Sequence, residues 1–328
     1  MLTLHSCAAT PQIVSPEDAP PALPKSAVWI DLFDPTPEEA ALIEKLAGVE
    51  LPSRADLDEI ESSSRFYLEN HVLYMSIPLV HQTDTGETVL TPAGFILTHD
   101  HLITLRFEAL HSFEVFLTQI SKPDAVAPHS LGAFIGLMDA IVDRTADKLE
   151  AVGTELRAIS KRVFAAESGK RPKPLRENKD MRVVLRRLGR AGELGSDLRD
   201  SLLGMGRIVP YVLNTTSEWA APPSLVSLKT LDRDIASLID YETHLSNKVQ
   251  LLLDATLGLV NIDQNNIFRI LTIVSVVGIP PTLIASMYGM NFDFMPELTW
   301  SWGYPFGLAL IALSGLIPII WFKWRGWF

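Results

Sequence analysis

Two long apolar stretches lie close to the C-terminal end of the chain. Residues 270–287 and residues 305–322 contain no Asp, Glu, Lys or Arg. As helices, each would be about 27 Å long at about 1.5 Å per residue, which is close to the ~30 Å hydrocarbon thickness of a bilayer. We therefore predict two transmembrane helices joined by a loop over residues 289–304.

A different periodicity marks the N-terminal third of the chain. Runs rich in β-branched and aromatic residues, typical of strands, cover residues 28–33, 65–79, 88–98 and 102–107. Helical signals occur over residues 40–47 and 53–62. The pattern predicts a cytoplasmic α/β domain over residues 27–125. The proline-rich residues 1–26 are expected to form a flexible lead-in.

Helical periodicity dominates after this domain. Stretches over residues 131–166 and 175–208 predict a cytoplasmic helical hairpin within residues 126–222. From the good N-cap Ser224 we find no convincing stop, so we predict one helix over residues 223–288. This helix would be about 96 Å long, and only its last third fits in a membrane. The remainder forms a stalk whose apolar face needs partners, and self-association is the simplest source of them.

The expected fold class is an α+β cytoplasmic domain followed by long helices. The very long stalk helix continues into the first of two transmembrane helices, and the second span, residues 305–322, leads into a basic cytoplasmic tail, residues 323–328. The single cysteine, Cys7, allows no internal disulfide. No signal peptide is recognised. Both observations agree with a cytoplasmic N-terminal region.

Charges beside the two spans predict the topology. The loop over residues 289–304 has no Lys or Arg, whereas Arg269 precedes the first span and Lys323 and Arg325 follow the second. The positive-inside rule then places both flanks in the cytoplasm and the loop outside. We expect a multi-pass protein of the cytoplasmic (inner) membrane, with the lipid bilayer as a partner.

Several other functions find little support in the sequence. Basic residues between 170 and 190 could form a nucleic-acid or lipid patch, but a solvated helix hairpin that pairs with acidic neighbours is favoured because no aromatic residues are interleaved to stack on bases. We therefore expect no nucleic-acid partner. The chain has no convincing nucleophile–base pair and no glycine-rich phosphate loop, so we do not expect an enzyme.

Small, polar or moderately apolar residues recur at spacings of three and four along the predicted long helix, which places them on one face. They are Asp254, Asn261, Asn265, Phe268, Leu271, Ser275, Ile279 and Thr282. We call them the stripe. Such a face lines an axial hole when parallel helices form a ring, but it also suits helix–helix packing. The spacing alone leaves both interpretations open.

The loop between the spans carries the most specific motifs. The sequence YGMNF begins at Tyr288, and MPEL begins at Met295. Together with residues 265–272, 280–287 and 321–328, these motifs closely resemble the CorA-type magnesium channel family. The remaining N-terminal portion resembles the family only in layout.

This resemblance implies a funnel-shaped homo-oligomer, a pentamer, that carries Mg²⁺ and also Co²⁺ and Ni²⁺. It favours the pore interpretation of the stripe, and Asp254, Asn265, Leu271 and Thr282 match family pore positions, with Leu271 in a hydrophobic constriction. Phe268 and Ile279 stand where relatives commonly have methionine. The resemblance places the selectivity filter at Tyr288, Gly289, Met290 and Asn291.

Asn291 and Gly289 suit hydrated Mg²⁺. The ion holds its water strongly, so neutral carboxamide and carbonyl oxygens that bond its water shell would allow release, whereas carboxylates would hold it tightly. Gly289 is expected to let the backbone turn sharply. Asp293 and Glu297 would attract cations to the outer mouth, unless they are ordinary solvated loop residues.

Regulation is predicted from acidic residues in the cytoplasmic part. The family resemblance implies that internal Mg²⁺ bridges acids of neighbouring subunits and favours the closed state. Candidates here are Asp232 and Asp234 with Asp56 and Asp58. Thr230 replaces one expected acid, and solvated helix faces explain the others equally well.

Arg269, Lys323 and Arg325 could form a basic collar at the membrane surface, although topology anchoring also explains them. The predicted function is a divalent cation channel for passive Mg²⁺ influx, gated by cytoplasmic Mg²⁺. Two alternatives remain, a zinc-selective proton-coupled relative and a membrane-anchored structural or signalling protein.

Overall fold

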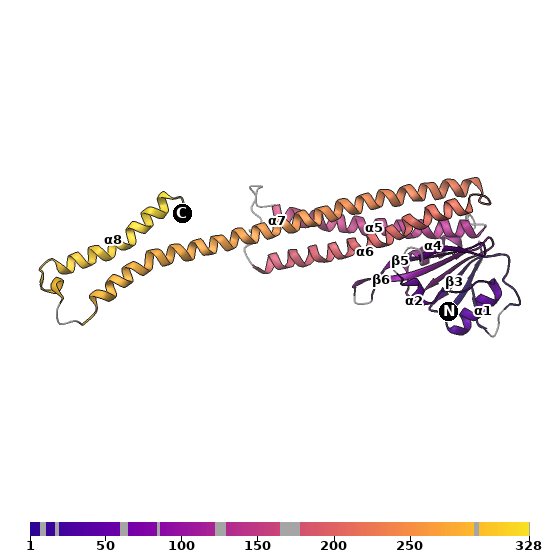
Figure 1. Ribbon diagram of the computed structural model, residues 1–328, viewed down its shortest axis with the longest axis horizontal. Coiled ribbons are helices and arrows are strands. Elements are labelled where there is room, and N and C mark those ends of the chain that lie inside the picture. The colour runs from indigo at the N-terminus through magenta and orange to yellow at the C-terminus, as the bar shows by residue number, and fades with distance from the viewer. Residues whose placement is uncertain are drawn as a thin grey trace. The chain divides into compact units, whose positions relative to one another are not determined.

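A computed structural model of the chain describes residues 1–6, 11–16, 20–59, 65–83, 86–121, 129–164, 178–291 and 295–327 (Figure 1). The chain divides into two compact units, Met1–Leu253 and Asp254–Phe328. Each unit is described by itself. Cys7, part of the expected second helix and Asp293 lie outside the described residues.

The first unit is built on one seven-stranded sheet with the order β2-β1-β3-β7-β6-β5-β4. Its strands are β1 (Leu2–Ser6), β2 (Gln12–Val14), β3 (Ala27–Phe33), β4 (Phe66–Glu69), β5 (Val72–Gln82), β6 (Thr88–Leu97) and β7 (Leu102–Arg106). Neighbouring strands are antiparallel except β3 and β7, which are parallel. The predicted mixture of strands and helices is therefore confirmed.

The expected flexible lead-in is wrong for part of residues 1–26. Strand β1 pairs with β3, with Leu2 opposite Leu32, and β2 pairs with β1, with Leu2 opposite Val14. Leu2 and Leu4 are buried in the core beneath the sheet. The prolines lie outside both strands, so they do not interrupt the hydrogen-bonding ladder.

Helices cover both faces of the sheet. On one face, Ile43 of α1 (Pro37–Ala47) and Leu57 of α2 (Arg54–Leu57) join a core with Ile30 and Leu32 of β3. Helix α1 begins at a capping box in which Thr36 and Glu39 each accept from the other's backbone N–H. Helix α2 is shorter than the predicted 53–62.

The other face is covered by helices that follow the sheet in the chain (Figure 1). These are α4 (His111–Ile120), which the sequence analysis did not predict, α5 (Ser130–Phe164) and α6 (Asn178–Thr216). Trp29 of β3 packs here, with ring centroids 6.2 Å from Phe113 and 5.1 Å from Phe116 of α4. Because side chains alternate along β3, its central residues are buried on both faces.

The predicted long helix is confirmed as α7 (Pro222–Tyr288). Within the first unit its buried residues include Leu228, Leu231, Ile235, Leu245 and Leu252, at spacings that keep them on one face. A Cβ placed on Gly153 of α5 would lie 3.5 Å from Leu245, and one placed on Gly206 of α6 would lie 3.5 Å from Ile235.

This packing corrects one inference from the sequence. Up to Leu253, the apolar face of α7 is covered by α5 and α6 of the same chain, so this part of the helix requires no second copy. The sequence argument for self-association therefore applies to the part of α7 that begins at Asp254.

An ion pair between α6 and α7 leads to a first prediction. Arg199 Nη1 donates to Glu242 Oε2 at 2.7 Å, and the Glu242 side chain is 3% exposed. Arg199→Met should lower the free energy of unfolding by about 2 kcal/mol, because a buried carboxylate loses its cation while the arginine itself is partly exposed. Thermal unfolding of the full-length protein should occur about 5 °C lower.

Two further variants control this measurement. Arg186→Met removes an exposed arginine from the same helix and should leave the melting temperature unchanged. Adding Glu242→Gln to Arg199→Met should recover part of the loss, because the unpaired charge disappears. Wild-type melting of Arg199→Met would show that the ion pair does not stabilise the fold.

The second unit contains the end of α7, the short 3₁₀ helix η3 (Pro296–Thr299) and α8 (Gly303–Trp324). Both long helices contain an 18-residue segment that is long and apolar enough to cross a membrane, and these segments are only 0% and 6% buried inside the protein. The core of a soluble protein would cover such segments. The expected hairpin of two spans is therefore present.

Glycines permit the close approaches within this unit. The carbonyl oxygen of Glu297 lies so near Gly303 that a side chain there would collide with it. A Cβ on Gly315 of α8 would lie 3.4 Å from the ring of Pro281 of α7. Helix α8 runs past the predicted span, so Lys323 belongs to its last turn and Arg325 is its C-cap.

Candidate ion-conduction site

The stripe lies along the part of α7 that belongs to the second unit. All of its members are exposed in a single chain except Ser275, which is half-buried. The large apolar members Phe268, Leu271 and Ile279 are 59%, 60% and 63% exposed. Within one subunit, the stripe is therefore not a seam against another part of the second unit.

The opposite side of α7 faces α8. Val277 and Pro281 approach Gly315, and Tyr288 shares a cavity with the first turns of α8. At about 100° per residue, these positions lie roughly 150° around the helix from Ser275, Ile279 and Thr282. Helix α8 thus covers one side of α7 and leaves the stripe uncovered.

Hydroxyl groups on this helix bond to its own backbone. Thr282 Oγ1 donates to the carbonyl of Gly278 at 2.8 Å, and Thr272 Oγ1 donates to that of Phe268 at 2.8 Å. Since each hydroxyl proton is used, the oxygens present lone pairs outward. The Thr282 oxygen can therefore accept a hydrogen bond from the water shell of a cation.

The filter motif continues from the last turn of α7. The amide of Gly289 donates to the carbonyl of Ala285 at 3.0 Å, and that of Met290 donates to the carbonyl of Met287 at 3.3 Å. Gly289 lies in a turn directly after α7, but its φ is not positive, so this turn does not use the left-handed conformation that favours glycine. A Cβ there would make only an ordinary contact of 3.4 Å with the Ala285 carbonyl, so the space around Gly289 does not itself require glycine.

Asn291 follows the end of this helix and is exposed. Its side chain makes no hydrogen bond with the described part of the chain, so its carboxamide is available to a ligand. Phe292 and Asp293 lie outside the described residues.

Glu297 lies beside Tyr288 and Gly289. It is half-buried in η3 and lines a cavity of about 430 Å³ together with Tyr288, Gly289 and Tyr304. The cavity lies between the last turn of α7 and the first turns of α8. Glu297 thus brings a carboxylate beside the end of the helix that carries the stripe.

The regulatory candidates lie in separate places in the first unit. Asp56 closes the capping box of α2 by accepting from the amide of Ser53 at 2.8 Å, and this bonding lowers the pKa of Asp56. Asp58 is the C-cap of the same helix. Among the residues that the structure describes, no group of three or more His, Cys, Asp or Glu could hold a metal ion.

Asp234 has acidic neighbours that the sequence analysis missed. Burial raises the pKa of Asp139 on α5, and the carboxylates of Asp143 and of Asp234 on α7 raise it further. Asp139 and Asp143 are four residues apart, so their shared helix face could be read from the sequence, but their proximity to α7 could not. The three carboxylates repel one another at neutral pH.

This repulsion gives a second prediction. Asp139→Asn should raise the melting temperature by about 1 °C at pH 7, because a raised pKa means that the folded state holds the charged carboxylate less favourably than the unfolded chain. Below about pH 3 the carboxyl is mostly protonated in both states, since the ordinary pKa of Asp is about 3.9, and the gain should vanish.

The measurement is thermal unfolding at both pH values without divalent cations. Asp147→Asn, which removes an exposed carboxylate from the same helix, is the matched control. A lower melting temperature for Asp139→Asn at pH 7, or an equal gain at both pH values, would contradict the repulsion.

The basic residues have definite neighbours where the structure describes them. Arg187 of α6 pairs with Glu155 of α5 through both carboxylate oxygens, which agrees with the hairpin interpretation of the basic segment. Residues 165–177 lie outside the described part. Arg325 lies over the ring of Trp321 at 5.5 Å, and Phe322 is buried between Trp321 and Trp327. Aromatic rings beside basic residues are typical of a membrane interface.

An α/β unit, a long helix and two apolar spans define a two-span membrane protein. The protein-family model described as CorA-like Mg²⁺ transporter protein matches residues 24–324. The chain belongs to this family.

Relatives agree over almost the whole length. The chain is 31% identical over 304 residues to the magnesium transport protein CorA of Yersinia pseudotuberculosis and 30% identical over 302 residues to that of Escherichia coli K12, covering 92% of each chain in both cases. The fold is similar to that of the CorA magnesium transporter from Methanocaldococcus jannaschii, with a TM-score of 0.76, 19% identity, and coverage of 100% of this chain and 99% of the other.

Proposed function

We propose that the chain forms a channel of the inner membrane that carries Mg²⁺ passively into the cytoplasm. The observation that carries this proposal is the uncovered stripe of α7, which lies on the side of the helix away from α8 and precedes Asn291 in the chain. Relatives at about 30% identity are magnesium transport proteins, which supports Mg²⁺ as the transported ion. In this proposal Co²⁺ and Ni²⁺ also pass through the same pore.

The pore requires several copies of the chain. One stripe is only one wall, and exposed apolar residues such as Leu257 and Ile262 on the same helix need partners. Parallel α7 helices arranged in a ring would turn their stripes inward and expose α8 to lipid. We propose a homo-oligomer of this kind, with five subunits as the family resemblance implies.

Selection occurs at the outer end of the ring. The carboxamide of Asn291 and the carbonyl of Gly289 provide neutral oxygens, which can accept hydrogen bonds from the octahedral water shell of Mg²⁺ without removing it. Met290 adjoins this rim, and Tyr288, on the side of α7 that faces α8, supports the rim from behind. Weak binding to the water shell allows release, which conduction requires.

The stripe combines polar and apolar sections. Asp254, Asn261 and Asn265 would form polar rings at the inner end, whereas Phe268 and Leu271 would form an apolar constriction. Hydrophobic constrictions gate channels by losing water. Further out, Ser275, Ile279 and Thr282 continue the path toward the filter.

Charges outside the pore complete the proposal. Glu297, and Asp293 in the loop, attract cations at the outer mouth, while Arg269, Lys323 and Arg325 fix both termini in the cytoplasm. The membrane potential then drives entry. A divalent ion crossing 100 mV gains about 4.6 kcal/mol, since each charge contributes about 2.3 kcal/mol.

Cytoplasmic Mg²⁺ also regulates the channel in this proposal. The described residues of one subunit hold no complete metal site, so the ligands would come from two subunits. Asp232 and Asp234 of one subunit and Asp56 and Asp58 of the next are the proposed pairs. Bound Mg²⁺ would reduce their repulsion and favour the closed state.

Reconstitution in liposomes tests the proposal. Mg²⁺ influx that increases with an imposed negative internal potential supports the channel, and uptake that follows a proton gradient would indicate a proton-coupled carrier instead. Intact oligomers without any flux would favour a membrane anchor.

A further inference from the structure

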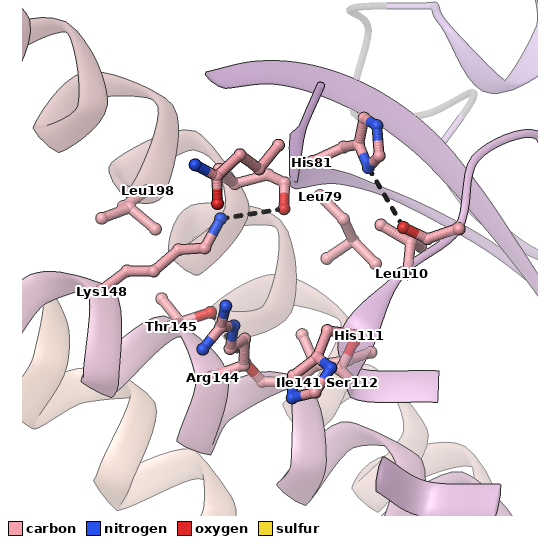
Figure 2. Close-up of a pocket in the computed structure, with 13 residues that line it drawn as sticks. Leu79, His81, Leu110, His111, Ser112, Ile141, Arg144, Thr145, Lys148 and Leu198 are labelled. Carbon is pink, nitrogen blue, oxygen red and sulfur yellow. Dashed lines mark hydrogen bonds between the residues drawn. The ribbon is translucent and has the colours of Figure 1, made fainter. Parts of the chain in front are cut away.

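A basic pocket in the first unit has no part in ion conduction. Its volume is about 220 Å³, and it lies where the C-terminal end of β5, the first turn of α4 and the middle of α5 meet (Figure 2). His81, His111, Arg144 and Lys148 line it, together with Ser112. Every charged group in this lining is a cation or can become one.

The two permanent cations come from one face of α5. Lys148 Nζ donates to the carbonyl of Val80 at 3.3 Å, and Arg144 lies one turn earlier on the same helix (Figure 2). Both side chains are half-buried. Within the described residues, neither Arg144 nor Lys148 forms an ion pair with a carboxylate. The two like charges repel each other, and the charge of nearby Asp197 offsets this repulsion at Lys148 only in part.

The pKa of Lys148 reflects its burial and the nearby positive charge. Burial lowers its pKa to about 8, with a contribution from Arg144, and Asp197 opposes this shift. At pH 7 most of Lys148 is still charged. An anion in the pocket would relieve the repulsion and raise this pKa.

The pocket lining also includes the first residues of α4, His111 and Ser112. Leu110 is the N-cap of α4, and its apolar side chain cannot accept a hydrogen bond from the first amides of the helix. Among the described residues, the amides of His111 and Ser112 find no backbone acceptor, although those of Phe113 and Glu114 both donate to Leu110. Uncapped amides at a helix N-terminus favour a negative charge.

Neighbouring carboxylates do not fill the pocket. Glu108 lies 3.8 Å from His81 Nε2, and Glu114 lies 3.3 Å from His111 Nδ1, so each acid is beside a histidine. His81 also bonds the carbonyl of Ala109 through Nδ1 at 3.1 Å (Figure 2). Arg144 and Lys148 are left for a ligand.

We propose that this pocket binds a small oxyanion of the phosphate class, held by Arg144, Lys148 and the first amides of α4. Arginine and lysine beside a helix N-terminus are the groups that proteins use for phosphate. A pocket of 220 Å³ is smaller than the roughly 300–1,000 Å³ typical of drug-sized ligands, so it suits one oxyanion rather than a whole nucleotide.

Titration of the purified full-length protein with inorganic phosphate tests the proposal, in EDTA and at constant ionic strength set with chloride. The wild type should show a saturable rise in melting temperature and a matching calorimetric isotherm. Arg144→Gln and Lys148→Gln should each weaken binding at least about tenfold. Arg157→Gln, which removes an exposed arginine of α5 that donates to Thr154, should bind like the wild type.

Three comparisons make the result decisive. Folding of each variant is checked by its melting temperature without phosphate, and Arg144→Lys, which keeps the charge, should retain part of the affinity. ATP without metal should bind no more tightly than phosphate if the site takes a free oxyanion, and more tightly if it takes the phosphate end of a larger ligand.

Sulfate, which keeps its charge, should bind more weakly as the pH rises from 7 to about 9 and Lys148 loses its proton. His81 and His111, with Glu108, Glu114 and Asp197, also face this group, but carboxylates and histidines change charge mostly below this range. Equal phosphate affinity in the wild type and both glutamine variants, or no saturable binding to the wild type, would overturn the proposal.

Discussion

Replacing Asn291 by alanine should reduce Mg²⁺ flux through the reconstituted protein at least about tenfold. Alanine removes one carboxamide from every subunit, so a whole ring of hydrogen-bond acceptors for the ion's water shell is lost. A loss of about 1.4 kcal/mol over the ring already gives a tenfold change in rate. The measurement is uptake of Mg²⁺ into liposomes under a fixed potential, with oligomer assembly checked by size-exclusion chromatography.

Two variants sharpen this experiment. Asn266→Ala removes the same carboxamide from α7 at a position outside the stripe, and it should conduct like the wild type. Asn291→Asp keeps an oxygen ligand but adds a ring of negative charges. It should bind the ion more tightly and therefore conduct more slowly than the wild type. Wild-type flux in an assembled Asn291→Ala oligomer would contradict the proposed filter.

Replacing Leu271 by asparagine should increase Mg²⁺ flux about fivefold when internal Mg²⁺ is high. Leu271 is 60% exposed on the stripe, and a ring of leucines would exclude water from the closed pore. Asparagine is similar in size but holds water, so it lowers the barrier that dewetting creates. Flux is measured in liposomes loaded with millimolar Mg²⁺, where the wild type should be mostly closed.

Leu271→Met is the matched control because it conserves volume and apolar character. It should close as the wild type does. If Leu271→Asn conducts no better than Leu271→Met at high internal Mg²⁺, the constriction lies elsewhere on the stripe.

Local patterns predicted the parts of the fold that depend on local physics. The two spans and the long helix follow from uncharged stretches and from unbroken helical spacing, and both are present in α7 and α8. Strands such as β3 were visible as β-branched runs. By contrast, β1 and β2 were missed because short strands beside prolines resemble a flexible segment, and only their pairing with β3 makes them strands.

The stripe could be read from spacing, but what it faces could not. The sequence does not say that α8 packs beside Val277 and Pro281, and this contact is what leaves the stripe uncovered. Likewise, a turn at Gly289 was expected and is present, but the sequence did not tell that its φ is not positive. The approach of Asp234 to Asp139, and the pocket at Arg144, depend on contacts between distant segments that no local pattern encodes.

The change in surroundings along α7 has a consequence for biosynthesis. Before Asp254, α7 buries residues such as Leu231, Ile235 and Leu245 within its own chain, and domains fold from the N-terminus during synthesis. The first unit can therefore acquire its native packing as a monomer on the ribosome, before the spans reach the bilayer. Subunits would then meet in the membrane with the first unit already folded, and assembly would add the contacts between neighbouring chains.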